Sequence, residues 1–215
     1  MRTIKPFSFL AMSRRAAITG AALAAMTTLA ACSGAGGGST AVEGDIGIGA
    51  PEGAKVTVVE YASVTCGACA AWQASTYEAF KEKYITTNKI RFVFRELPTG
   101  PVDVAAAGFL TARCAGDDKY FDVVHEIMAS QPELLGGGNP RTVLLRIANA
   151  AGLSEEQFTQ CVSDPENIAA LETRVRQASD AGISGTPTFL VNGERLVGAP
   201  TLENLSTAID AELAK

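Results

Sequence analysis

The feature that most constrains the fold of this 215-residue chain is the motif Cys66-Gly67-Ala68-Cys69, because of the segments on either side of it. The apolar, β-branched run Val56–Tyr61 comes before it and is typical of a buried strand. The segment from Ala70 to about Tyr84 predicts a helix. The first thiol therefore lies at a helix N-terminus, where free backbone N–H groups and the helix dipole favour a thiolate. This placement indicates thiol–disulfide chemistry.

The strands predicted around the motif form a β-α-β unit. Lys55–Tyr61 and Ile90–Arg95 are the expected strands, and the helix between them runs from about Cys66 to Thr86. Such a unit implies a parallel strand pair with a right-handed crossover. Near the C-terminus, the strand Thr186–Val191 is followed by Asn192-Gly193, a strong hairpin signal. A strand at Arg195–Val197 and an amphipathic helix capped by Thr201 complete the chain.

The region between these two groups of strands predicts only helices. The start signals are Asp103 for a helix through Cys114, Asp117 and Asp118 for one through Ala129, Pro140, a capping box at Ser154-Glu155-Glu156-Gln157, and Asp164-Pro165 for a helix that ends near Gly182. Gly136-Gly137-Gly138 predicts a loop. The fold class that follows is α/β, with an all-helical insertion at about residues 101–182.

The first thirty-one residues have the pattern of an export signal. Four basic residues precede an apolar run over 16–31, and no acidic residue occurs before Glu43. The run is too short and too rich in alanine for a membrane-spanning helix. It ends in Leu29-Ala30-Ala31-Cys32, which resembles a bacterial lipobox, and this resemblance implies cleavage before Cys32 and a lipid on its side chain. The alternative is an ordinary signal peptide in which Cys32 is incidental.

The part of the chain after the signal divides into a spacer and a folded domain. Residues 32–50 are rich in glycine and serine and predict a flexible spacer, and the folded domain is expected over 51–215. Cleavage before Cys32 would leave 14 basic and 23 acidic residues, a net charge of −9. Such a charge argues against binding to nucleic acid or to an anionic membrane surface. A lipid-tethered domain on the periplasmic face of a bacterial membrane is the expected location, or the periplasm itself without the lipid.

Several segments together resemble the DsbA family of exported thiol–disulfide oxidoreductases. These are Val59-Glu60-Tyr61-Ala62-Ser63, the Cys66–Cys69 motif, Arg95-Glu96-Leu97-Pro98, and Gly185–Gly193 with its Thr186-Pro187 pair. The resemblance covers the chain from about Val56 to the C-terminus. It implies a thioredoxin-like fold with an inserted helical subdomain.

The resemblance also implies a role for each matched residue. Cys66 would attack a client protein to form a mixed disulfide, and Cys69 would resolve it. Thr186 and Pro187 would be joined by a cis bond beside the thiols. Glu60 would lie beneath the thiol pair and relay the proton of Cys69; the alternative is a solvated strand residue. The chemistry needs no cofactor and no metal.

Other interpretations of the cysteines stay open at this point. Cys66 and Cys69 could be half of a metal site, but zinc needs about four ligands, and the only histidine, His125, is distant in sequence. They could form a purely structural disulfide, although their spacing closes almost no loop. Cys114 and Cys161 could staple two helices of the insertion, or remain as buried thiols. A chaperone-like or metal-binding lipoprotein is the remaining rival function.

The residues between the two active-site cysteines bear on the direction of electron flow. The strongest oxidants of the family carry Pro-His there, whereas Gly67 and Ala68 offer no polar partner to the thiolate. We therefore expect a weaker oxidant, with a potential of roughly −150 to −250 mV. The expected clients are reduced or mispaired exported proteins, and a membrane redox partner would restore the active state. Reductase or isomerase activity is the alternative. The spacer is too short for a dimerisation domain, so we expect a monomer.

Overall fold

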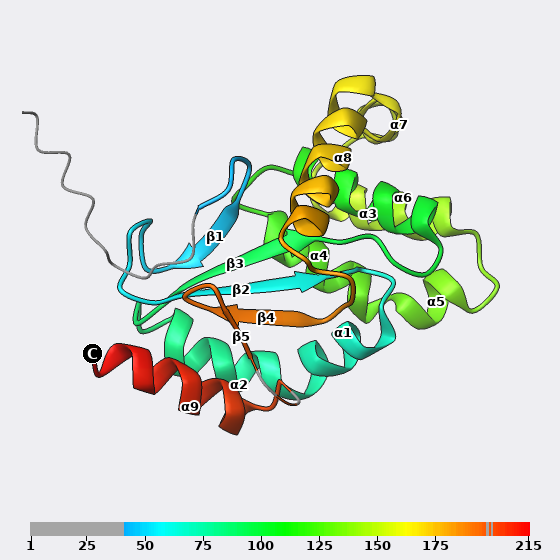
Figure 1. Ribbon diagram of the computed structural model, residues 1–215. Helices are drawn as coiled ribbons and strands as arrows, with labels where there is room; N and C mark the ends of the chain where they lie inside the picture. The colour runs from blue at the N-terminus through cyan, green and yellow to red at the C-terminus, as the bar shows by residue number, and fades with distance from the viewer. Residues whose placement is uncertain (1–40, 197, 199) are drawn as a thin grey trace, which may run out of the picture. The chain divides into compact units, whose positions relative to one another are not determined.

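The computed structural model describes residues 41–196, 198 and 200–215, and the predicted export signal and Cys32 lie outside them. The strands are β1 (Ile46–Gly49), β2 (Thr57–Ala62), β3 (Arg91–Glu96), β4 (Thr188–Val191) and β5 (Glu194–Arg195). They form a mixed sheet in the order β1-β3-β2-β4-β5 (Figure 1). Only β2 and β3 are parallel, as the β-α-β pattern predicts, and the other neighbours are antiparallel.

The helix after the cysteine motif is continuous from Gly67 to Ile85. It consists of α1 (Gly67–Trp72), a π-helical segment η1 (Gln73–Tyr77), α2 (Glu78–Phe80) and a second π-helical segment η2 (Lys81–Ile85). The backbone keeps right-handed helical angles at each junction. The single helix predicted over about 66–86 is therefore confirmed.

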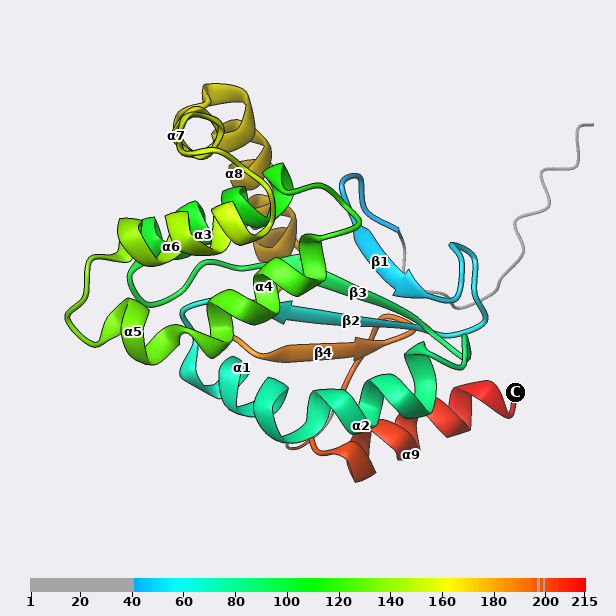
Figure 2. The same ribbon diagram turned by 180° about the vertical axis from the view of Figure 1, so that it is seen from behind.

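The helical insertion follows β3. Its helices are α3 (Val102–Cys114), α4 (Tyr120–Ala129), α5 (Gln131–Leu135), α6 (Pro140–Ala150), α7 (Glu155–Ser163) and α8 (Pro165–Asp180). The capping box predicted at Ser154 is present, and the Asp164 carboxylate caps α8 by accepting the backbone N–H of Glu166 at 2.7 Å. After the β4–β5 hairpin, α9 (Leu202–Leu213) ends the chain. Figure 2 views the structure from the side opposite to Figure 1, and in it α3 and α4 lie together on the near side of the sheet.

The two faces of the sheet bury different sets of side chains. Because strand side chains alternate, one face of β2 presents Val58, Glu60 and Ala62, and its apolar members join the main core with α1, α4 and α9. The other face presents Val59 and Tyr61, which pack with Ala178 of α8 and with Ile183. All six β2 residues are buried. The sheet is thus covered on both faces, and Glu60 lies on the face of the active-site helix.

The sequence-based boundary at Pro51 places the start of the domain too late. Ile46–Gly49, predicted as part of a flexible spacer, pair with β3 as an edge strand. The Asp45 carboxylate holds this strand through a bidentate ion pair with Arg95, with N–O distances of 2.7 and 2.9 Å. The glycines of this segment concealed the strand, because its stability comes from β3 and from a distant arginine. The short helix α5 was not predicted either.

A buried carboxylate joins β3 to the insertion. The side chain of Glu96 is fully buried, and its carboxylate accepts the Nε–H of Arg113 (α3) at 2.6 Å and pairs with the guanidinium of Arg174 (α8). The hydroxyl of Tyr120 (α4) donates to the same carboxylate at 3.1 Å. Three helices of the insertion are therefore attached to the end of one strand.

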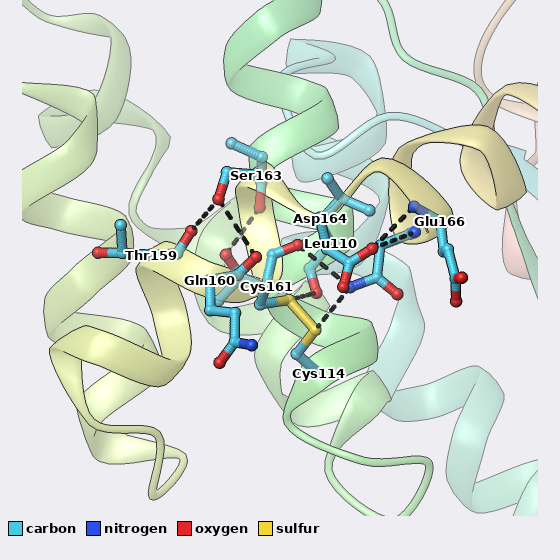
Figure 3. The surroundings of a disulfide bond; sticks show 11 residues. Leu110, Cys114, Thr159, Gln160, Cys161, Ser163, Asp164 and Glu166 are labelled. Atoms are coloured by element: carbon cyan, nitrogen blue, oxygen red, sulfur yellow. Dashed lines mark hydrogen bonds between the residues drawn. A yellow bond between two sulfur atoms is a disulfide. The ribbon is translucent and has the colours of Figure 1, made fainter.

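A disulfide lies within the insertion. Cys114 at the end of α3 is bonded to Cys161 in α7, 47 residues apart in sequence (Figure 3). The Asn167 amide donates to the carbonyl of Cys161 at 3.2 Å, next to the Asp164 cap of α8. Closing a loop of this length stabilises a fold by about 4 kcal/mol in the chain-entropy model.

One glycine sets how closely the insertion approaches the cysteine motif. Gly108 lies in α3, and a Cβ atom there would lie 2.9 Å from Cγ2 of Val64, which is closer than packed carbons allow. Val64 is fully buried in the turn between β2 and α1. The absence of a side chain at this position therefore lets α3 pack directly on that turn.

The Glu96 network predicts a large stability loss on removal of its charge. Glu96→Gln leaves Arg113 and Arg174 without a buried anion, and breaking such a pair costs about 3–5 kcal/mol. Urea unfolding measures the loss. Glu133→Gln is the matched control, since the ion pair of Glu133 with Arg146 is solvent-exposed and such pairs contribute about 0–1 kcal/mol. Equal losses in the two variants would contradict the prediction.

Candidate active site

Cys66 lies at the junction of the β2–α1 turn and the helix. It is the N-cap residue of α1, with extended backbone angles (φ −81°, ψ 115°), and its Sγ accepts the backbone N–H of Cys69 at 3.2 Å. Cys66 is partly exposed, whereas Cys69, one turn into the helix, is fully buried. The two thiols are not bonded to each other in this structure. The Cys66 sulfur can therefore be reached from solvent, whereas that of Cys69 is shielded from it.

The loop that begins β4 lies against Cys66. The Thr186–Pro187 bond is cis, and Sγ of Cys66 lies 3.6 Å from the carbonyl oxygen of Thr186, to which the protonated form of the thiol can donate. The two segments are 120 residues apart in sequence. The structure thus brings Cys66, Cys69, Thr186 and Pro187 into one site.

The surroundings of the two thiols separate their pKa values. The pKa of Cys66 is lowered from 9.0 to about 5, first by the hydrogen bond from the Cys69 side chain and further by Thr186 and the backbone N–H groups at the helix start, which outweigh partial burial. The pKa of Cys69 is raised, because its proton is shared with Cys66 and because it is buried. At neutral pH the pair therefore carries one thiolate, at Cys66, and one proton, at Cys69.

Glu60 lies beneath the thiols in the centre of β2. It is 4% exposed, between Phe94 of β3 and Phe189 of β4 in the sheet register. Burial raises its pKa from 4.5 to about 8, and the negative charge on Cys66 contributes. Its charge in turn contributes to the raised pKa values of Cys69 and Tyr77. A solvated strand residue is therefore excluded, and the carboxyl group can hold or release a proton near pH 8.

The sequence did not predict a set of hydroxyl groups that lies beside the site. Ser63 and Thr65, in the turn before Cys66, share a hydrogen bond of 3.0 Å. The backbone N–H of Thr99 donates to the Ser63 hydroxyl at 3.1 Å, and the Thr99 hydroxyl lies 3.5 Å from that of Thr186. These contacts link the turn, the loop after β3 and the cis-proline loop. Their only signal in the sequence was that Ser63 belongs to a segment resembling the family.

Trp72 and His125 are packing residues. The indole N–H of Trp72 donates to the carbonyl of Pro200 at 2.7 Å, and its ring packs on Phe189. His125 of α4 packs against the ring of Tyr77, and burial lowers its pKa to about 4, so it is neutral at physiological pH. Within the described part of the chain, no three metal-ligating side chains gather in one place.

The raised pKa of Glu60 predicts how stability depends on pH. In the oxidised protein, where Cys66 does not titrate, burial keeps Glu60 protonated in the folded state after the unfolded chain has released its proton. Stability therefore falls as the pH rises from about 4.5, by about 1.4 kcal/mol per unit, until the folded pKa is reached. Glu60→Gln should abolish this decline and be about 3 kcal/mol more stable than the wild type at pH 7. Urea unfolding across this range measures both, and parallel profiles would contradict the assignment.

Comparisons with known proteins show which family and which fold the chain resembles. A family model described as thioredoxin matches residues 41–211. A Rickettsia conorii protein, provisionally named a protein-disulfide oxidoreductase, is 36% identical over 161 residues, which are 74% of this chain and 57% of that protein. The chain thus spans little more than half the length of this curated relative. No helix among the described residues is long and apolar enough to span a membrane.

Two solved structures show the same architecture. The crystal structure of Wolbachia pipientis α-DsbA1 has a TM-score of 0.73 at 24% identity and covers 81% of this chain and 93% of its own. Oxidised BdbD from Bacillus subtilis has a TM-score of 0.74 at 18% identity and covers 83% and 97%. The predicted thioredoxin-like fold with a helical insertion is confirmed. Since the family model spans most of its length, the chain belongs to the thioredoxin family, with the fold of the DsbA proteins.

Proposed function

We propose that the chain is a thiol:disulfide oxidoreductase that exchanges disulfides with exported proteins through Cys66 and Cys69. The observation that carries the proposal is the arrangement of a partly exposed thiolate at a helix N-terminus, a buried protonated thiol one turn away, and the cis-proline loop against Cys66. This arrangement supports an ordered exchange, in which the client sulfur bonds to Cys66 first and the electron pair of the broken disulfide goes to Cys69.

The exchange with a reduced client proceeds in two steps. A client thiolate attacks Sγ of Cys66 in the oxidised protein, a client–Cys66 disulfide forms, and the Cys66–Cys69 bond breaks with its electron pair on Cys69. The leaving thiolate takes a proton, which the carboxyl group of Glu60 can supply because its pKa is about 8. A second client thiolate then attacks the client sulfur, and Cys66 leaves as a thiolate. The client is oxidised, and the dithiol is reduced by the same two electrons.

The lowered pKa of Cys66 supports an oxidant of intermediate strength. A thiolate that is stable at neutral pH stabilises the reduced protein and makes the disulfide more oxidising. The pKa of Cys66 is shifted downward, the direction found in reactive cysteines at helix N-termini. Gly67 and Ala68 are exposed and offer the sulfur only their backbone. Net oxidation of clients in the cell then requires a redox partner that reoxidises the pair.

The activity test compares the wild type with single cysteine variants. The wild-type protein should oxidise reduced, unfolded ribonuclease and should equilibrate with glutathione at roughly −150 to −250 mV. Cys66→Ser should be inactive. Cys69→Ser cannot form its own disulfide, so it should be inactive on reduced ribonuclease but accumulate a mixed disulfide when Cys66 attacks ribonuclease that carries scrambled disulfides. If the wild type oxidised ribonuclease no faster than Cys66→Ser, the protein would not be an oxidoreductase, and the result would favour a chaperone-like role. A potential below about −250 mV would instead favour a reductase.

We also propose that the domain is exported and held at a membrane by lipid on Cys32, as the lipobox-like sequence before it supports. The folded domain starts near Ile46, so the linker is shorter than the spacer expected from the sequence. Palmitate labelling in a bacterial host should mark the full-length wild type and not Cys32→Ser. Labelling of both proteins, or of neither, would contradict the lipid anchor.

A further inference from the structure

Gln131 is a buried polar residue that the exchange chemistry described above does not use. It is the first residue of α5, the short helix of the insertion, and the residue is only 9% exposed. In sequence it lies 65 residues after Cys66. The neighbouring residues Met128 and Leu134 are apolar and buried. A primary amide in such a position costs free energy unless its hydrogen bonds are made.

The amide of Gln131 contacts the turn that carries Cys66. Its Nε2 donates to the carbonyl oxygen of Val64 at 2.8 Å and to the carbonyl oxygen of Cys66 at 3.1 Å. One NH₂ group therefore bridges two carbonyls on either side of Thr65. A primary amide has two N–H donors, so both are directed at this turn.

The contact with the Cys66 carbonyl bears on the position of the sulfur. The same oxygen accepts the backbone N–H of Ala70 at 3.1 Å, the hydrogen bond that starts α1. The orientation of this peptide group fixes how Cys66 enters the helix, and hence whether its Sγ can accept the N–H of Cys69. Gln131 also places the positive end of its amide dipole next to the turn, which favours negative charge there.

We propose that Gln131 is a positioning residue of the active site. By holding the Val64 and Cys66 carbonyls, it aligns the Cys66 sulfur with the N-terminus of α1 and so sets the redox equilibrium of the dithiol. The inference rests on the proposed oxidoreductase function. It assigns to the helical insertion a direct part in the chemistry of the thioredoxin-like half, through one amide.

Gln73 offers a matched comparison within the same helix. Its Nε2 also joins the active-site helix to the insertion, by donating to the carbonyl of His125 in α4 at 3.1 Å. It lies in η1, two turns along the helix from Cys66, and its contact does not involve the turn. Substitution of Gln73 therefore removes an amide bridge between the same two parts of the domain and leaves the Cys66 carbonyl untouched.

The experiment measures Gln131→Met against the wild type and Gln73→Met. Methionine keeps the length of the side chain and removes both donors. For each full-length protein, the equilibrium constant for reduction of the disulfide by two glutathiones, with release of one glutathione disulfide, is measured at pH 7. The pH dependence of the alkylation rate of Cys66 is measured on the reduced proteins.

Gln131→Met should lower the equilibrium constant for reduction about 3- to 10-fold, because its hydrogen bonds to the turn stabilise the thiolate of the reduced protein more than the disulfide of the oxidised protein. The alkylation profile should move to higher pH in the same variant, because the thiolate is less stabilised. Gln73→Met should stay within about twofold of the wild type on both measures. Gln131→Asn, whose shorter side chain withdraws the amide from the turn, should shift in the same direction and replaces the methionine variant if that variant does not fold cooperatively.

Two results would overturn the proposal without touching the proposed function. One is a normal equilibrium constant and alkylation profile in Gln131→Met or its asparagine counterpart. The other is an equal shift in Gln73→Met, which would make the effect a general consequence of loosening the insertion. A wild type that glutathione cannot reduce and reoxidise would instead refute the oxidoreductase function itself.

Discussion

The buried carboxylate of Glu96 is the interaction on which the two parts of the domain depend. It ends β3, the strand next to β2, and it neutralises arginines from α3 and α8 while it accepts the hydroxyl of Tyr120. The carboxylate is fully buried and the two arginine side chains are mostly buried, so removing either charge leaves the other poorly compensated. The insertion is thereby held against the carboxyl end of the parallel strand pair, where β2 leads into the cysteine motif.

The two thiols of the cysteine motif have opposite environments, and these shift their pKa values in opposite directions. Cys66 has a helix start, neighbouring donors and access to solvent, which lower its pKa, whereas Cys69 is buried. Glu60 is buried as well, so the carboxyl group below the thiols keeps its proton in the range where an ordinary carboxylate has lost it. The fold thus places a thiolate at the surface, and it buries the thiol and the carboxyl group that keep their protons beneath it.

Much of the fold and of the candidate site could be predicted from local patterns in the sequence. The Cys66–Cys69 motif follows a strand and starts a helix, and the caps at Ser154 and Asp164 depend only on neighbouring residues. β1 and Gln131 could not be found in this way. Ile46–Gly49 is a strand because β3 and Arg95 hold it, and Gln131 reaches Cys66 only after the insertion has packed. Both depend on contacts across 42 or more residues, which no local pattern records.

At Gly108 the fold limits the size of the side chain, although this residue takes no part in the chemistry proposed for the site. The spacing between α3 and the turn at Val64 is set by the room that one missing methyl group leaves. A change as small as alanine at this position would force α3 and the turn that leads to Cys66 to shift against each other. A residue without a functional group thus sets a packing distance beside the cysteine motif, and such sites of close packing belong among the positions where substitution would disturb the motif.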